Sequence, residues 1–404
     1  MSEPFLPYAR PSVGEEELAA IRECIENGWL TTGPKVREFE QQFAALAGVR
    51  HAVALNSCTA GLHLGLHALG VGPGDEVIMP SLTFVAGAQC ARELGAREVF
   101  ADVDDALCIT PETIERVITA RTKVIMPMHY AGRPAQTEAI VAFARERGIA
   151  VLEDAAHAVG MLDRGRWSGA LSDGAAYSFY PTKNITTTEG GMFLTNNDML
   201  AERVRVLSLH GMNKDAWKRY AQGGKWRYDV VEAGYKYNMP DISAALGIVQ
   251  LQKLENFQRR RDEIARAYCD AIASLRGVHV VSNFAEAPSR HAWCMFVIAV
   301  DEQLAGISRD QLIDRLSDAG IGTSVHYIPT HTFSAYRDPE VHLPNTDRLW
   351  PRILSLPLYP DMNDLHVERV IDALRRLLQS GPRRNASSFF GSSGAGVQRV
   401  VRSA

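Results

Sequence analysis

The chain has 404 residues, of which 46% are hydrophobic and 22% charged, with a formal net charge of −4 and an isoelectric point near 6.3. This composition indicates a globular protein with a substantial core and room for two domains, and it lacks the basic excess of a nucleic-acid-binding protein. The six cysteines are scattered and include no C-x-x-C pair, so we expect neither disulfides nor a zinc site. The first residues do not resemble a signal peptide, and no apolar run is long enough to span a membrane. We therefore expect a cytoplasmic protein without membrane contact.

Short apolar runs alternate with helix-like segments over the first 200 residues. The runs predict strands at 51–55, 76–80, 98–103, 123–130, 149–154, 175–180 and 191–195. Most of them are continuous rather than alternating, which is typical of strands buried on both faces. Helical patterns lie between several of them, such as TEAIVAFARERG, which is expected to stop at Gly148. The alternation predicts an α/β fold with a mostly parallel sheet and helices on both of its faces.

The pattern changes in the second half of the chain. A long helix is expected to begin at Asp241, and a smaller α+β unit follows, with a helix ending at Gly320. We therefore divide the chain into an N-terminal arm (1–15), a large domain (16–250), a small C-terminal domain (251–380) and a tail (381–404). The tail is rich in Gly, Ser and Arg and is expected to be disordered.

The first predicted strand runs into the stretch NSCTAGLHLGL, where a helix starts at once. Ser57 and Thr59 could bind an anion there, because a helix N-terminus offers free backbone N–H groups next to their hydroxyls. The same residues are also ordinary helix caps, which is the commoner role of Ser and Thr at this place. The residues alone leave both interpretations open.

Two more predicted strands end in ionisable residues. Strand 149–154 carries Asp154 to its carboxyl end and His157 follows, although each could simply cap or pack a loop. Lys183, directly after strand 175–180, is either an exposed loop lysine or a Schiff-base nucleophile. Ligands bind at the carboxyl ends of strands in open α/β sheets. An anion site, a carboxylate and a lysine together meet the needs of pyridoxal phosphate (PLP): an anchored phosphate, a protonated ring nitrogen and an aldehyde held as an imine.

Six motifs occur in order between about residue 5 and residue 378: GWLTTGPKVREFE, NSCTAGLHLGL, EDAAHAVG, SFYPTKNITTTEGG, GYKYNMPDISAALGIVQLQKL and GIGTSVHYIPTH. With this order and spacing the chain resembles the sugar aminotransferases of the DegT/DnrJ/EryC1/StrS family, within the fold-type I PLP enzymes. The resemblance implies a seven-stranded PLP-binding domain and a smaller C-terminal α+β domain. Within the family, FLPYARPSVGEEELAAI and GWLTTGPK are most similar to the UDP-4-amino-4-deoxy-L-arabinose–oxoglutarate aminotransferase type.

The resemblance also implies roles for individual residues. Lys183 would hold the cofactor aldehyde and then move a proton, Asp154 would pair with the ring nitrogen, and His157 would lie beside the ring. The further residues implied to bind the phosphate or the ring face are Ser57, Thr59, Ala60 (through its backbone N–H), Phe84, Ser178 and Asn238. Asn238 would reach a phosphate bound mainly by the other subunit, which implies a homodimer with shared active sites.

The resemblance implies that the substrate entrance is lined by Trp29, Thr31, Thr32, His326, Tyr327 and His331, although each of them could equally be a packing residue of a loop or strand end. Arg227 is a further candidate by charge and position, because it belongs to the loop NKDAWKRYAQGGKWR, whose other basic residues also suit a diphosphate: Lys214, Lys218, Arg219 and Lys225. The same stretch could equally be a solvated surface loop. The implied reaction moves an amino group from L-glutamate to a nucleotide-linked ketosugar, here a UDP-4-keto sugar such as a UDP-4-keto-pentose. Its products are an aminosugar nucleotide and 2-oxoglutarate.

Two other functions are weighed against transamination. Sugar dehydratases of the same family carry histidine in place of the Schiff-base lysine, so the intact Lys183 favours transamination. A non-catalytic PLP-fold regulator would usually carry a DNA-binding or membrane segment, and the sequence has neither. His63 and His67 are four residues apart on a predicted helix, but they have no carboxylate or thiol nearby in sequence, so we predict no metal site.

Overall fold

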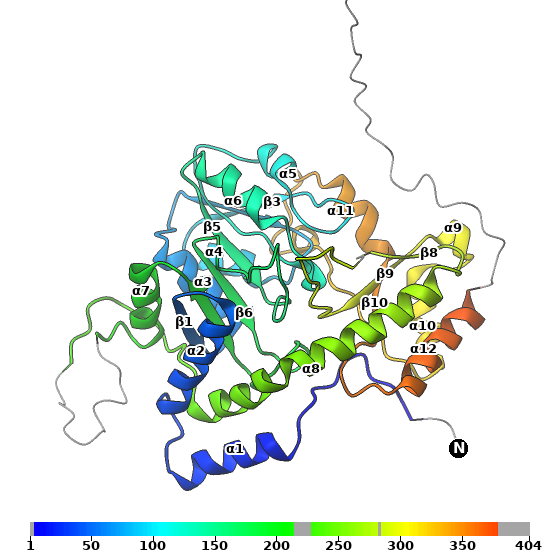
Figure 1. Ribbon diagram of the computed structural model, residues 1–404. Helices are drawn as coiled ribbons and strands as arrows, with labels where there is room; N and C mark the ends of the chain where they lie inside the picture. The colour runs from blue at the N-terminus through cyan, green and yellow to red at the C-terminus, as the bar shows by residue number, and fades with distance from the viewer. Residues whose placement is uncertain (1–3, 214–227, 282–283, 379–404) are drawn as a thin grey trace, which may run out of the picture.

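The computed structural model describes residues 4–213, 228–281 and 284–378, and this part of the chain contains two sheets (Figure 1). The strands of the larger sheet lie in the order β1 (His51–Leu55), β7 (Gly191–Thr195), β6 (Gly174–Ser178), β5 (Ala150–Ala155), β4 (Thr122–Ile125), β2 (Glu76–Pro80) and β3 (Arg97–Ala101). β7 is antiparallel to both β1 and β6, and the other neighbours are parallel. The prediction of a mostly parallel seven-stranded sheet is confirmed.

All seven predicted strands are present, but the one predicted over 123–130 is wrong in its second half. β4 ends at Ile125, although the next N–H, that of Met126, still bonds to the Ile78 carbonyl at 2.7 Å. Pro127 then interrupts the ladder, because proline has no N–H to donate. The chain continues into a short 3-10 turn, η1 (Tyr130–Gly132), which carries it over the end of the sheet.

Helices cover both faces of the larger sheet, and its strands are buried on both sides. The covering helices are α2 (Pro34–Ala47), α3 (Cys58–Ala68), α4 (Ala86–Glu93), α5 (Pro111–Glu115), α6 (Thr137–Arg145) and α7 (Asp198–Ser208). α3 packs unusually close, since a Cβ atom at Gly61 would lie 2.9 Å from the Cβ of Ala176 in β6. Neighbouring residues of β6 belong to different cores, Ala176 under α3 and Tyr177 under α2 and α8 (Asp241–Ile272).

α8 connects the larger part of the molecule to the smaller part and is 32 residues long (Figure 1). It begins at Asp241, as predicted. The Asp241 carboxylate accepts hydrogen bonds from the backbone N–H groups of Gly33, Lys35 and Val36 at 2.7, 3.1 and 3.0 Å, so it caps the start of α2. α1 (Glu15–Glu26) lies along α8. The domain limits stay a prediction; residues 250 and 251 both lie inside α8.

The smaller part has an antiparallel sheet of β8 (Val278–Val280), β9 (Phe296–Val300) and β10 (Ile353–Leu356). Its helices are α9 (Glu302–Ala305), α10 (Arg309–Asp318), α11 (Pro344–Leu349) and α12 (Asp364–Leu377), with 3-10 turns η3 (Thr330–Thr332) and η4 (Trp350–Arg352). The N-terminal arm is fixed to this part: the Leu6 N–H bonds to the Gly320 carbonyl and the Leu6 carbonyl to the Gly322 N–H, both at 2.8 Å.

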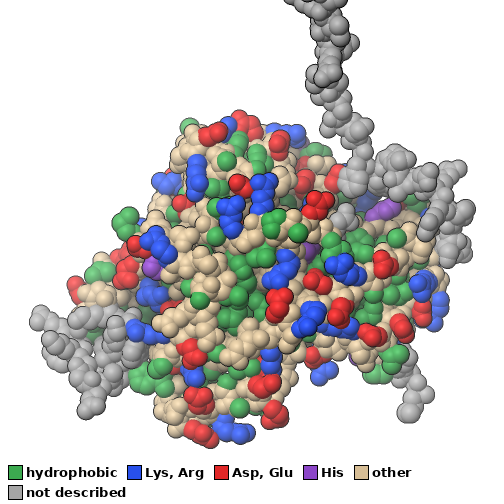
Figure 2. All heavy atoms as spheres, in the orientation of Figure 1, with side chains coloured by type: hydrophobic (Ala, Val, Ile, Leu, Met, Phe, Trp, Pro, Cys, Tyr) green, Lys and Arg blue, Asp and Glu red, His purple; other side chains and the backbone are tan. Residues whose placement is uncertain are grey.

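The surface is mixed in charge. On the face shown in Figure 2, blue Lys and Arg side chains and red Asp and Glu side chains are interspersed rather than gathered by sign. Among the described residues, no helix has both the length and the apolar character needed to cross a membrane.

Candidate active site

The carboxyl ends of β5 and β6 bring the predicted carboxylate and lysine to one edge of the sheet. The two strands are parallel, with Asp154 opposite Ala176, so Asp154 and Ser178 leave the sheet at the same end. Both side chains are buried. Lys183 follows in a turn after β6 and is half-buried. Its ammonium lies close enough to Asp154 to oppose the rise that burial causes in the pKa of that carboxyl.

Gly191 joins the start of α3 to the ends of β1 and β6. It lies opposite Leu55 of β1 and opposite Ser178 of β6. A Cβ atom at Gly191 would lie 2.5 Å from the Ser57 carbonyl oxygen and 2.6 Å from the Cys58 nitrogen. Glycine therefore lets the two backbones approach closely and places the start of α3 beside Ser178.

Ser57 and Thr59 have different positions at the start of α3. The Ser57 hydroxyl accepts a hydrogen bond from the Ala60 N–H at 3.0 Å, so Ser57 is a helix cap in this structure. Thr59 is exposed in the first turn. The first N–H groups of a helix have no acceptor within the helix and favour negative charge. Thr59, Ser178 and this helix end thus form a suitable cradle for a phosphate.

Asp154 is a buried carboxylate, and only one of its two oxygens accepts a hydrogen bond from the described residues. Its Oδ1 accepts from the Ala156 N–H at 3.1 Å, and its Oδ2 has no hydrogen bond within the described part of the chain. Burial raises the pKa of Asp154, while the Ala156 N–H and the charge of Lys183 oppose that rise. A cationic N–H at Oδ2 would further stabilise the ionised carboxylate.

His157 and Phe84 both face Tyr327, which comes from the smaller part of the molecule. His157 Nε2 lies 2.9 Å from the Tyr327 hydroxyl, and the Phe84 and Tyr327 ring centroids are 6.1 Å apart. His157 is fully buried, whereas Phe84 is 58% exposed. An aromatic ring that is exposed to this degree and lies against Tyr327 is available to cover a ligand ring.

His326 and His331 were both implied to line the substrate entrance, and their rings are engaged with the protein. His326 Nδ1 lies 2.8 Å from Ser355 Oγ, and burial together with the Lys183 charge lowers the pKa of His326 to about 3. His331 Nδ1 lies 2.7 Å from Ser81 Oγ, and its Nε2 lies 3.3 Å from Asp347. His331 thus anchors η3 to the end of β2.

A second group forms around the start of α8. Asn238 donates from Nδ2 to Thr32 Oγ1 at 2.6 Å and accepts from Lys236 Nζ at 2.6 Å. The Trp29 indole N–H donates to the Thr32 carbonyl at 3.3 Å, and the Thr31 carbonyl accepts from the Asp241 N–H at 3.3 Å. The backbone next to Asn238 pairs with Leu55, so this group lies beside the start of α3.

Some predicted residues lie outside the described part of the chain. These are Arg227 and the other basic residues of its loop: Lys214, Lys218, Arg219 and Lys225. Their proposed contact with a diphosphate stays a prediction. His63 and His67 are described; the His63 ring lies 4.8 Å and the His67 ring 6.1 Å from the ring of Tyr235.

A buried hydrogen-bonded network behind Asp154 was not predicted. Glu153 accepts from the His129 Nε2–H at 2.7 Å, the Gly169 N–H at 2.7 Å and the Ser172 hydroxyl at 2.5 Å. His129 Nδ1 accepts from the Ala135 N–H at 3.2 Å, which leaves Nε2 as its donor. Burial raises the pKa of Glu153, but these donors outweigh it and the net pKa lies below the ordinary value. The alternation of side chains along a strand was the available signal, since it places Glu153 and Asp154 on opposite faces.

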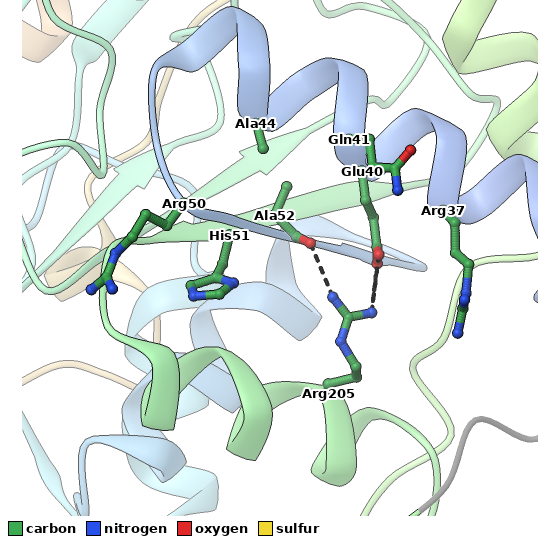
Figure 3. Close-up of a pocket in the computed structure, with 8 residues that line it drawn as sticks. All are labelled: Arg37, Glu40, Gln41, Ala44, Arg50, His51, Ala52 and Arg205. Atoms are coloured by element: carbon green, nitrogen blue, oxygen red, sulfur yellow. Dashed lines mark hydrogen bonds and ion pairs between the residues drawn. The ribbon is translucent and has the colours of Figure 1, made fainter.

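A cavity of about 270 Å³ lies away from these strand ends, at the outer edge of β1 (Figure 3). It is lined by Arg37, Glu40, Gln41, Ala44, Arg50, His51, Ala52 and Arg205. Arg205 pairs with Glu40 at 3.0 Å, and Arg50 and His51 both pair with Asp198. None of the predicted site residues lines it. Because these charged side chains are paired within the protein, we interpret them as stabilising the fold rather than as binding a ligand.

The strand-end residues fit PLP. Asp154 Oδ2 can accept a hydrogen bond from a protonated ring nitrogen, the start of α3 and Ser178 can hold a phosphate, and Lys183 is at the same edge. His157 Nδ1 is buried without a partner in the described residues, which is what a missing neighbour would leave. This fold with this set of residues defines a PLP-dependent enzyme of fold type I.

The chain belongs to the DegT/DnrJ/EryC1/StrS aminotransferase family, whose model matches residues 11–375. The protein is therefore an aminotransferase that acts on sugars and uses PLP. The spore coat polysaccharide biosynthesis protein SpsC of Bacillus subtilis (strain 168) is 47% identical over 381 residues, 93% of this chain and 97% of SpsC.

Two solved structures are similar over nearly their whole length. The putative sugar aminotransferase Spr1654 of Streptococcus pneumoniae, in its PLP form, is 30% identical with a TM-score of 0.85, covering 92% of this chain and 98% of that one. DesI, solved in the presence of its TDP-sugar product, is 33% identical with a TM-score of 0.82, covering 93% of each chain. These relatives do not assign this chain to the UDP-4-amino-4-deoxy-L-arabinose type.

Proposed function

We propose that the protein transfers the amino group of L-glutamate to a nucleotide-activated ketosugar, giving an aminosugar nucleotide and 2-oxoglutarate. The observation that carries this proposal is that Lys183 and the buried Asp154 lie close to each other at the ends of adjacent strands, in a family of sugar aminotransferases. DesI supports a nucleotide-linked sugar, and SpsC supports a role in polysaccharide synthesis. The sequence resemblance favours UDP and a 4-keto sugar such as a UDP-4-keto-pentose, whereas DesI acts with a TDP sugar.

The chain's own residues have distinct tasks in this reaction. PLP, when bound, supplies an electron sink for the carbon that loses a proton. Lys183 Nζ takes the proton from the α-carbon of the amino donor and later returns one to the sugar carbon that receives the amine. Asp154 Oδ2 holds a proton on the ring nitrogen, and the buried setting of Asp154 strengthens that interaction by excluding water. Thr59, Ser178 and the start of α3 bind the phosphate.

The proposal includes a homodimer, in which Asn238 contributes to the neighbouring subunit's site. Asn238 lies beside the start of α3 and is intermediate in exposure, and its amide is oriented by Lys236 and Thr32. An isologous dimer would present two such residues symmetrically. The oligomeric state and a mixture of Lys183→Ala and Asn238→Ala subunits test this part: activity returns on mixing if each site uses residues of both chains.

The test of the reaction is the absorbance spectrum of PLP-loaded protein before and after addition of L-glutamate. Conversion to the spectrum of the amino form is expected in the wild type and is expected to be lost in Lys183→Ala. Lys123→Ala is the matched control, because Lys123 is an exposed lysine in β4. UDP- and TDP-linked 4-keto sugars are then tested for restoring the first spectrum. The proposal would be overturned if the spectrum of the PLP-loaded protein stayed unchanged with L-glutamate and with every other amino acid added.

A further inference from the structure

Tyr327 connects the smaller part of the molecule directly to the strand-end site. Its hydroxyl oxygen lies 2.9 Å from His157 Nε2, and the planes of the two rings are 9° apart. A phenol hydrogen and an imidazole lone pair both lie near their ring planes, so nearly parallel rings allow a hydrogen bond between them. The neighbouring residue is also held, since the Tyr130 hydroxyl donates to the His326 carbonyl and the His326 ring bonds to Ser355.

The surroundings decide which of the two groups donates. Burial and the charge of Lys183 lower the pKa of His157 far below its ordinary value, so its ring is neutral. A neutral imidazole has one N–H donor and one acceptor nitrogen. Burial also raises the pKa of Tyr327, so the hydroxyl keeps its hydrogen. Of the two groups a phenol hydroxyl is the better donor and an imidazole nitrogen the better acceptor, which makes Tyr327 the donor.

We propose that Tyr327 is a positioning residue: it donates its hydroxyl hydrogen to His157 Nε2 and thereby fixes the imidazole as the neutral Nδ1–H tautomer. The catalytic consequence rests on the proposed function. While this bond holds, His157 Nε2 cannot take up a proton during transamination, so the acid–base work falls to Lys183. His157 then acts as a hydrogen-bonding group, with a buried Nδ1–H that has no acceptor in the described residues.

The tautomer can be measured without any reaction. The full chain, free of cofactor and labelled with ¹⁵N-histidine, gives different nitrogen shifts for the two tautomers, and the His157 signals are identified by their loss in His157→Gln. The wild type is expected to show a protonated Nδ1 and an unprotonated Nε2. Tyr327→Phe keeps the ring and removes the hydroxyl, and it is expected to raise the Nε2–H share about tenfold, the ratio that one ordinary hydrogen bond carries.

Tyr130→Phe is the matched control, because it removes a hydroxyl that holds the same segment at His326 without touching His157. It is expected to leave the His157 tautomer unchanged. A wild type with Nε2–H, an unchanged tautomer in Tyr327→Phe, or an equal change in Tyr130→Phe would each overturn the proposal. Failure of the glutamate half-reaction in the wild type would instead overturn the proposed function and leave the tautomer result standing.

Discussion

Replacing Gly191 with alanine is expected to weaken PLP binding by pushing the start of α3 away from Ser178. Ordinary contact with a Cβ atom begins at 3.4 Å, and the added atom would lie 2.5 and 2.6 Å from the Ser57 oxygen and the Cys58 nitrogen. The two backbones must therefore separate by about 0.9 Å, which is more than the range of good hydrogen-bond lengths allows. Losing one or two charge-assisted bonds to the phosphate costs about 3 kcal/mol in binding, or roughly 100-fold in affinity.

The assay is an equilibrium titration of PLP against the Lys183→Ala protein, so that covalent capture does not mask the loss. Gly191→Ala and Gly72→Ala are compared in that background, because a Cβ atom at Gly72 would have no atom of the described residues within 4 Å. Unfolding of the cofactor-free proteins checks that Gly191→Ala folds, with an expected loss of about 1–3 kcal/mol from overpacking. A folded Gly191→Ala protein that binds PLP as tightly as its parent would refute the assignment of the phosphate to this helix end.

Two further predictions concern buried ionisable groups. Glu153→Ala leaves the buried Gly169 N–H without its acceptor and leaves His129 Nε2–H with Ser168 Oγ alone, so it is expected to cost about 3 kcal/mol in urea unfolding. Glu138→Ala, which breaks an exposed pair with Arg164, should cost less than about 1 kcal/mol, and similar losses in both variants would contradict the network. Burial, with the charge of Arg133, lowers the pKa of His291 to about 3, so the unfolded chain binds a proton below about pH 6.5 while the folded chain does not. The free energy of unfolding should thus fall as the pH drops from about 6.5 towards 3, by up to about 1.4 kcal/mol per pH unit. His291→Gln should reduce this slope, whereas His342→Gln, at an exposed position, should leave it unchanged.

The sequence was most informative about local order. Continuous apolar runs predict buried strands because their periodicity reflects burial on both faces, and the start of α8 is visible because Pro240 and Asp241 form a strong helix-start signal. Parallel strands end at one edge, so Asp154, Ser178 and Lys183 could be placed together before any contact was seen.

Contacts between distant segments were not predictable in the same way. The Tyr327–His157 bond joins residues 170 positions apart, and no local pattern encodes such a pairing. The antiparallel placement of β7 between β1 and β6 likewise depends on packing of the whole sheet. The sequence pattern placed His129 in a strand, whereas in the structure β4 ends at Ile125, and His129 lies beyond it and bonds to Glu153.

The pair of Glu40 and Arg205 has a consequence for solubility. β1 is the outermost strand of its sheet, and such a strand offers unpaired backbone groups as a template for another chain. Arg205 donates to the Ala52 carbonyl at 3.2 Å (Figure 3). Glu40 accepts from the Ala54 N–H at 2.9 Å, so two side chains take the place of a neighbouring strand. The ion-paired side chains therefore occupy backbone groups at the edge of the sheet and block pairing with a strand of another molecule. Their loss would leave these groups of β1 open to such pairing.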